Sequence, residues 1–212
     1  MSSVRKVSGI TRRRFLLTLA ALGLSTHSAL FAQSAGRQSA ATRQLEALRA
    51  GGLVIYFRHP PTTWNGVDQI GWPRERQRLL SAEGQAQART VGVAFQRHQL
   101  RVDEVLASPF ARCRDMAEIA FGRVEERREL LGLLSQDAGT QQRIAYSLEL
   151  LRRPVEGNKL RVIVGHSSNI RASAGVDVSE GSAVIVRPGD GAAGFEVVDI
   201  LELGDWQALT GH

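Results

Sequence analysis

The feature that most constrains the fold of this chain is an alternation between short apolar runs and longer segments with helical spacing. "LVIYF" (53–57) and "LRVIVG" (160–165) are continuous apolar runs, as expected of strands that are buried on both faces. Between them, "SAEGQAQARTVGVAFQRH" (81–98) has helical spacing behind Ser81, a favoured N-cap residue. Strands that alternate with helices predict an α/β fold, a three-layer α/β/α arrangement around a mostly parallel central sheet.

The remaining segments extend this alternation over a single domain. No internal repeat, low-complexity tract or long linker divides residues 40–212. Ser108 is expected to cap a helix that begins with Pro109, because serine is favoured at the N-cap and proline at the first helical position. Further strands are expected at 102–108, 123–127, 182–188 and 195–203, and further helices at 41–52, 109–121, 139–152 and from Ser168 or Asn169 onward.

The basic charge of the chain is concentrated at its N-terminus. The formal net charge is +6, from 27 Lys and Arg residues against 21 Asp and Glu residues. Residues 1–32 hold five of the basic residues and none of the acidic ones, which leaves 22 against 21, or +1, for the rest. A nearly neutral domain lacks the electrostatic footprint of a DNA- or RNA-binding protein, so no nucleic-acid partner is expected.

The first 32 residues have the pattern of an export signal. Basic residues precede the apolar run "FLLTLAALGL" (15–24), which is shorter than the ~20 residues that span a bilayer. "TRRRFLL" resembles the twin-arginine signal pattern. We therefore expect residues 1–32 to be a signal peptide, cleaved after Ala32 and recognised by the Tat export machinery. Residues 33–212 would form a periplasmic or secreted domain; an uncleaved membrane anchor is the alternative for the N-terminal segment.

Polar residues follow three of the expected strands at the point where each strand ends. Arg58 and His59 follow the first strand, Arg112 lies one helical turn after the second, and His166 follows the strand at 160–165. The carboxyl ends of parallel strands meet at one edge of the sheet, where α/β proteins bind ligands. Guanidinium groups match the oxygens of phosphate in geometry and charge. The sequence therefore predicts a site for a phosphate dianion at this edge.

These residues stand in motifs that resemble those of the histidine phosphatase superfamily, the phosphoglycerate-mutase-like proteins. Arg58-His59-Pro60 resembles the Arg-His-Gly signature of that family, and Trp64-Asn65 follows at the family's spacing. The other matching stretches are "LSAEGQAQA", "SPFARCRDMAEIAFG" and "VIVGHSSNIR", in the family's order. The resemblance runs from about residue 53 to residue 172 and implies the phosphoglycerate-mutase-like fold.

The resemblance also implies an activity, a phosphomonoester hydrolase for a small-molecule phosphate ester that needs no metal and no cofactor. His59 would be the nucleophile and form a phosphohistidine, while Arg58, Arg112 and His166 would form the phosphate pocket. Asn65 and Ser167 would be further substrate-binding residues. The mutase activity of some relatives is less expected, since an isomerase of glycolytic acids has no obvious role outside the cytoplasm.

Two positions depart from the family pattern. Pro60 replaces the signature glycine, which fixes φ and removes a backbone N–H donor. The general acid that protonates the leaving group has no clear match. Glu129 is the first candidate and Asp68, in the long loop 60–80, is the second. In the same loop, Trp64, Trp72 and the basic run Arg74, Arg76 and Arg78 are expected to form a lid over the substrate, or the arginines form a solvated surface.

Two other readings of the site remain open. One is a catalytically weak phosphate-binding protein on the same fold. The other is a serine hydrolase in which Ser167 of "GHSSN" is the nucleophile, although Asn169 replaces the closing glycine of the G-x-S-x-G pattern. Cys113, the single cysteine of the chain, cannot form an internal disulfide and is expected to pack on a helix face.

Overall fold

The computed structural model describes residues 43–134, 139–189 and 191–211, which lie in one compact unit, Gln38–His212. The expected signal peptide at 1–32 lies outside the described residues, so its assignment stays a prediction. Residues 43–50 are helical, as the sequence indicates, and end at Gly51 in a left-handed conformation (φ +75°).

The centre of the described unit is a six-stranded sheet with the order β3-β2-β4-β1-β5-β6. Neighbours from β3 to β1 run parallel, whereas β5 lies antiparallel to both β1 and β6. The predicted α/β fold with a mostly parallel sheet is confirmed. The strands are β1 (Leu53–Arg58), β2 (Arg101–Ala107), β3 (Glu125–Glu126), β4 (Lys159–Gly165), β5 (Ala183–Pro188) and β6 (Phe195–Leu201).

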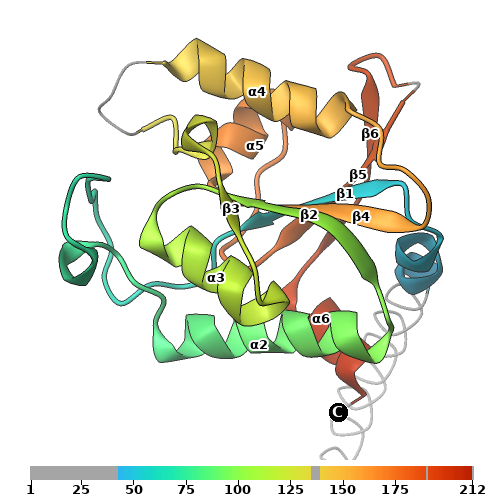
Figure 1. Cartoon of the computed structure of the whole chain (residues 1–212), viewed down its shortest axis with the longest axis horizontal. Coiled ribbons are helices and arrows are strands. Elements are labelled where there is room, and N and C mark those ends of the chain that lie inside the picture. Colours follow the sequence, from blue (N-terminus) through green and yellow to red (C-terminus); the bar gives the residue numbers. More distant parts are fainter. Residues whose placement is uncertain (1–42, 135–138, 190, 212) are drawn as a thin grey trace, which may run out of the picture. The chain divides into compact units, whose positions relative to one another are not determined.

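Helices cover both faces of the sheet (Figure 1). One face is covered by α2, α3 and α6, and the other by α4 and α5. The bounds are α2 (Ala82–Arg97), α3 (Ala111–Phe121), α4 (Thr140–Arg152), α5 (Ser167–Ala174) and α6 (Leu203–Thr210), with 3-10 turns η1 (Arg74–Arg76) and η2 (Arg128–Leu130).

The alternation of side chains along β1 divides the core into two parts. Ile55 and Phe57 pack into the larger cluster under α2, α3 and α6. Val54 and Tyr56 point the other way, into the cluster under α4 and α5. All four side chains are buried, which explains why the strand carries no charged residue before Arg58.

Two of the predicted boundaries are wrong. The segment 195–203 is not strand to its end, because α6 begins at Leu203 behind a capping box of Glu202 and Asp205, and buries Trp206. Ser108 does not cap α3, which begins at Ala111 with Phe110 as its N-cap residue. The hydroxyl of Ser108 has a different partner, in the site described below.

The start of α2 is held against the chain that follows β1. Ser81 caps the helix as predicted, because its Oγ accepts from the N–H of Gly84 at 3.0 Å. The N–H of Ser81 donates to the carbonyl of Pro61 at 3.0 Å. A Cβ on Gly84 would lie 2.2 Å from that carbonyl oxygen. The L-S-x-x-G motif therefore holds residues 60 and 61 against α2 and so fixes the segment that follows His59.

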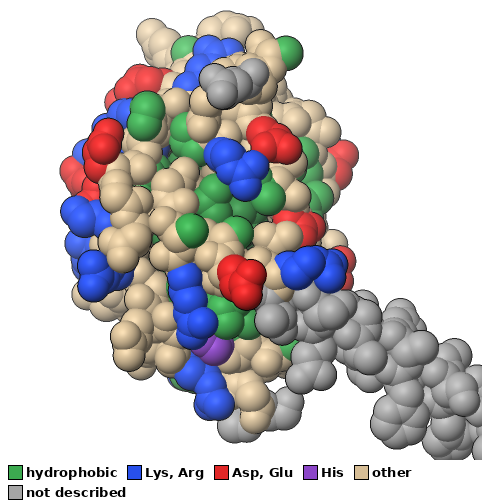
Figure 2. Space-filling model, turned by 90° about the vertical axis from the view of Figure 1, so that its right-hand side faces the viewer, with side chains coloured by type: hydrophobic (Ala, Val, Ile, Leu, Met, Phe, Trp, Pro, Cys, Tyr) green, Lys and Arg blue, Asp and Glu red, His purple; other side chains and the backbone are tan. Residues whose placement is uncertain are grey.

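Charged side chains of both signs share the surface. On the face shown in Figure 2, basic and acidic side chains of the described residues are interspersed, with hydrophobic side chains between them. This mixture matches the near-neutral charge calculated for the chain without its first 32 residues. Within 43–134, 139–189 and 191–211, no helix has the length and apolarity needed to cross a bilayer.

Replacement of Gly84 by alanine should destabilise the domain by about 1–3 kcal/mol, because the new methyl group overlaps backbone rather than a flexible side chain. Gly71 is the matched control, since nothing lies within 4 Å of a Cβ at that position. Chemical denaturation of Gly84→Ala, Gly71→Ala and the wild type measures the difference. Equal free energies of unfolding for both variants would contradict the close approach of Pro61.

Candidate active site

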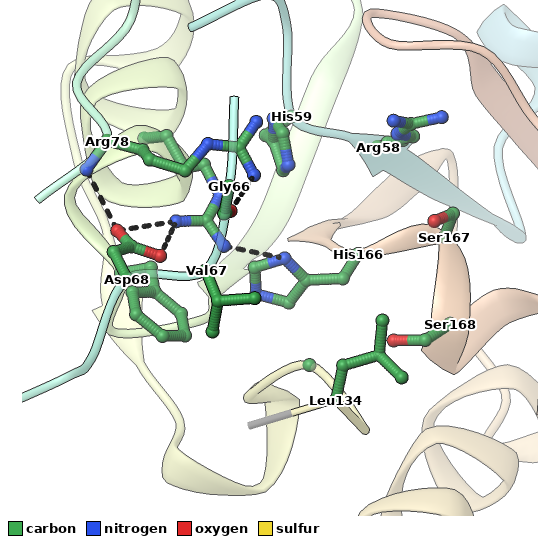
Figure 3. A pocket seen from close by; sticks show the side chains of 13 residues that line it. Arg58, His59, Gly66, Val67, Asp68, Arg78, Leu134, His166, Ser167 and Ser168 are labelled. Carbon is green, nitrogen blue, oxygen red and sulfur yellow. Dashed lines mark hydrogen bonds and ion pairs between the residues drawn. The ribbon is translucent and has the colours of Figure 1, made fainter. Parts of the chain in front are cut away.

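The carboxyl ends of β1, β2 and β4 bring the predicted residues together in one pocket of about 250 Å³ (Figure 3). The rings of His59 and His166 lie 5.6 Å apart, centroid to centroid, and meet edge to face. The residues that line the pocket are Arg58, His59, Gly66, Val67, Asp68, Arg78, Phe110, Arg112, Gly132, Leu134, His166, Ser167 and Ser168.

His59 has a fixed orientation. Its Nδ1 lies 2.9 Å from the carbonyl oxygen of Pro60, so this nitrogen carries the hydrogen and donates it. Nε2 is then left with its lone pair. The backbone N–H of His59 donates to Gly165 of β4 at 3.1 Å, which ties the end of β1 to the neighbouring strand. Proline at position 60 removes an N–H from the family signature but keeps the carbonyl that aims the imidazole.

His166 is held from both sides of its ring. Its Nε2 lies 2.9 Å from the hydroxyl of Ser108, and its Nδ1 lies 3.4 Å from an amino group of Arg112. A guanidinium only donates, so Nδ1 accepts and Nε2–H donates to Ser108. Cys113 packs beneath this ring as a fully buried thiol, 3.8 Å from Nε2.

Tyr56 fixes the backbone of His166 from inside the sheet. Its hydroxyl donates to the carbonyl of His166 and accepts from the N–H of the same residue, both at 3.0 Å. A Cβ on Gly165 would lie 2.2 Å from that hydroxyl. The glycine of the V-G-H motif is therefore needed for the tyrosine to reach the turn that carries His166.

Arg112 is buried and held by a carboxylate. Its Nη1 lies 3.0 and 3.1 Å from the two carboxylate oxygens of Asp68, and both side chains are almost fully buried. The guanidinium also lies over the ring of Phe110, 4.3 Å from its centroid. Within the S-P-x-x-R motif, Phe110 and Arg112 thus line the pocket, and Ser108 holds the imidazole of His166.

A third arginine, Arg78, lines the pocket beside Arg58 and Arg112. Its guanidinium donates to Thr62 Oγ1 at 2.8 Å and to the carbonyl of Gly66 at 3.3 Å. Glu180 lies between two of the arginines, 3.3 Å from Arg58 and 3.7 Å from Arg78. From the sequence, Arg78 was expected only as part of a lid or of a solvated surface, and Glu180 was not assigned to the site. Arg78 falls in the loop 60–80 without a recognisable motif, and Glu180 in the turn before β5.

The two imidazoles are neutral in this environment. Burial and then Arg112 lower the pKa of His59 from its usual value to about 3, with smaller contributions from Arg78 and Arg58. Burial and Arg112 also lower the pKa of His166 well below its usual range. A neutral imidazole retains a nucleophilic nitrogen, whereas a protonated one has none.

Two of the residues that the sequence nominated lie outside the pocket lining. Asn65 is exposed in the loop after β1. Glu129 is exposed in η2, because the turn directs the adjacent Leu130 into the core and the glutamate away from it. Ser167 lines the pocket as expected, at the start of α5. Of the two carboxylates proposed as general acid, only Asp68 reaches the pocket.

The other residues nominated as a lid are engaged elsewhere in the loop. Arg74 forms a paired ion bridge with Asp115 of α3, with both N–O distances at 2.8 Å. Arg76 stacks over the ring of Trp72, 4.9 Å from its centroid. These contacts attach the loop to α3 and to itself rather than to the pocket. Among the described residues, no group of three or more His, Cys, Asp or Glu side chains is placed to hold a metal ion.

Residues 54–135 match the model of the Histidine phosphatase superfamily (branch 1). This part of the chain is similar to the histidine phosphatase superfamily. The matched residues include His59 and Arg112, whereas His166 lies beyond the match and is joined to them by the fold. No curated protein sequence matches the chain.

Solved structures share this fold at low sequence identity. One is the protein histidine phosphatase SixA complexed with tungstate (16% identity, TM-score 0.53, 71% of this chain and 97% of that chain). A second, from Escherichia coli str. K-12 substr. MG1655, has a proposed alpha-ribazole-5'-P phosphatase activity (16%, 0.54, 72% and 98%). A third is a histidine-to-alanine mutant of a phosphoserine phosphatase from Entamoeba histolytica with phosphoserine (13%, 0.52, 72% and 98%). The shared architecture confirms the phosphoglycerate-mutase-like fold.

The lowered pKa of His59 predicts a pH-dependent stability. Between about pH 3 and pH 6.5 the unfolded chain binds more protons at this residue than the folded chain does. The contribution of His59 to the free energy of unfolding is therefore fully present above pH 6.5 and is lost as the pH is lowered. In His59→Gln, which lacks the titrating ring, the loss of stability between pH 7 and pH 4.5 should be smaller by on the order of 2 kcal/mol. Urea denaturation at both pH values, in buffers without phosphate, measures this difference. Equal losses in the variant and the wild type would show that His59 titrates normally.

Proposed function

We propose that this protein is a phosphomonoester hydrolase that acts through a phosphohistidine on His59. The observation that carries the proposal is the imidazole itself. It is buried and neutral, its Nδ1–H is bound to the carbonyl of Pro60, and three guanidinium groups surround it. An oriented neutral nucleophile inside a cationic pocket suits attack on a phosphate dianion.

In the first step, Nε2 of His59 forms a bond to phosphorus while the bond from phosphorus to the ester oxygen breaks and its electrons leave with that oxygen. Arg58, Arg78 and Arg112 are the candidates to hold the remaining oxygens and to neutralise their charge. The backbone N–H groups at the start of α5, at Ser167 and Ser168, are further donors at the edge of the pocket. These arginines provide the charge neutralisation that the proposed reaction needs.

In the second step, water attacks the phosphohistidine, the bond between phosphorus and nitrogen breaks, and inorganic phosphate and neutral His59 return. His166 lies 5.6 Å from His59 in the same pocket. Binding of a dianion raises the proton affinity of a neighbouring imidazole. His166 is therefore placed to donate through Nδ1 to a phosphate oxygen once that anion has drawn Arg112 away.

We propose a positioning role for Asp68 in place of the general-acid role considered from the sequence. Its carboxylate accepts from Arg112 through both oxygens and from the backbone N–H of Arg78 at 2.8 Å. Both carboxylate oxygens thus accept hydrogen bonds from Arg112, and one of them also accepts from Arg78, so Asp68 is engaged with these two arginines. It orients Arg112 and balances its charge while the pocket is empty.

The two alternative readings receive less support. A protein that only binds phosphate has no need of an imidazole whose tautomer is fixed by Pro60. A serine hydrolase needs a base for Ser167, and the adjacent His166 already uses its two nitrogens with Ser108 and Arg112. The N-terminal pattern extends the proposal to a phosphatase that the Tat export machinery carries out of the cytoplasm.

Hydrolysis of p-nitrophenyl phosphate by the chain without residues 1–32 tests the nucleophile. His59→Ala should lower kcat/KM by a factor on the order of 10³ or more, because the covalent route is lost. His98→Ala is the matched control, since this histidine contacts Arg49 and Leu209 and does not line the pocket. Equal turnover by wild type and His59→Ala would contradict the proposal.

Substitution of Asp68 by asparagine separates the two roles considered for this residue. If Asp68 positions Arg112, Asp68→Asn should lower kcat/KM by roughly 10- to 100-fold for p-nitrophenyl phosphate and phenyl phosphate alike. A general acid would matter more for phenyl phosphate, whose leaving group is the stronger base. A loss confined to phenyl phosphate would restore the acid role to Asp68.

A further inference from the structure

The mouth of the pocket carries two large apolar side chains that water reaches. Val67 is 64% exposed and Leu134 is 83% exposed, and both line the pocket. In the view of Figure 3 both lie around the imidazole of His166, one from the loop after β1 and one from the loop after η2. Single exposed apolar residues are common, but two at the entrance of one small pocket are a feature of that pocket.

Polar contacts of neighbouring residues hold Val67 in its exposed position. The carbonyl of Gly66 accepts from Arg78, and Asp68 is bound by Arg112 and by the N–H of Arg78. Arg78 and Arg112 thus fix the residues on both sides of Val67. The exposure of its side chain is a consequence of this arrangement.

Leu134 follows a segment that is fixed in the same way. The N–H of Leu133 donates to Ser168 Oγ at 3.0 Å, and the carbonyl of Gly132 accepts from Arg143 at 3.1 Å. Ser168 belongs to α5, next to the turn that carries His166. The loops that bear the two apolar residues are therefore both anchored to elements that build the phosphate site.

The pocket divides into a floor for an anion and a wall for an apolar group. His59, His166 and Arg112 are almost fully buried and form the floor. The volume, about 250 Å³, lies below the roughly 300–1,000 Å³ of sites that enclose a drug-sized ligand. A bound phosphoryl group would thus leave the rest of its ester at the mouth, against Val67 and Leu134.

We propose that the substrate is a phosphate ester whose leaving group is apolar, and that Val67 and Leu134 bind this group. The inference rests on the proposed phosphatase function and names the substrate class of the same site. A polyol such as a sugar would either leave both side chains in water or give up its own hydrogen bonds to water in order to contact them. An apolar group, in contrast, removes its own apolar surface and that of the two side chains from water.

Binding of non-hydrolysable ligands, measured by isothermal titration calorimetry, tests the proposal without relying on turnover. Phenylphosphonate should bind the wild type about fivefold or more tightly than 2-hydroxyethylphosphonate. In Val67→Ser/Leu134→Ser this preference should fall below about twofold, while the affinity for tungstate stays within about twofold of the wild type. Val93→Ser and Ile119→Ser are matched controls, because these exposed apolar residues do not line the pocket, and they should keep the preference.

The outcomes separate this inference from the function on which it rests. Tungstate binding with equal affinities for the two phosphonates would overturn the apolar substrate class and leave the phosphate site standing. A preference that survives in the double variant would overturn the assignment to Val67 and Leu134. Failure of the wild type to bind tungstate would overturn both the inference and the proposed function.

Discussion

The ion pair between Arg112 and Asp68 is the interaction on which the site depends. It joins α3 to the loop after β1, across 44 residues of sequence, and both side chains are almost fully buried. Removal of one partner of a buried pair typically costs about 3–5 kcal/mol, because the other charge is left without compensation. In this pocket the guanidinium of Arg112 has to be in place before the substrate binds. Asp68 allows the empty site to hold a buried guanidinium in a fixed orientation.

Burial, and then the same concentration of positive charge, keeps the two histidines neutral. Arg112, Arg78 and Arg58 all act to lower the pKa of both His59 and His166, in addition to burial. A protonated imidazole in this place would add to the charge and lose its lone pair. The proposed chemistry and the electrostatics therefore favour one form, with Nε2 of His59 unprotonated. The pocket is prepared for a dianion and is unfavourable for a further cation.

The sequence predicted the framework of the site because the framework is local. Each strand end is an apolar run followed by polar residues, so Arg58, His59, Arg112 and His166 were identified and placed at one edge. Arg78 was expected only in a lid or on a solvated surface, because its place in the pocket depends on the path of an irregular loop, which no periodicity describes. Glu180 was missed for the same reason.

Tertiary contacts also explain why some predictions from the sequence were wrong. Ser108 has the right position for a helix cap, but the nearby imidazole of His166 takes its hydroxyl, a contact across 58 residues. Glu129 was chosen as the nearest glutamate after the strand that follows Arg112, although its register was poor, and burial of Leu130 turns it away from the pocket. The helix α6 was hidden because its start continues the apolar pattern of β6.

The most direct test of the central claim is acid-labile phosphorylation during turnover. The protein would be mixed with p-nitrophenyl phosphate, unfolded rapidly in alkali and digested, and the peptides sequenced by mass spectrometry. Our account predicts a phosphoryl group on Nε2 of His59, found on the peptide that contains this residue. Asp68→Asn should carry the label on the same residue. Label on another residue, or full turnover with no label, would contradict the account.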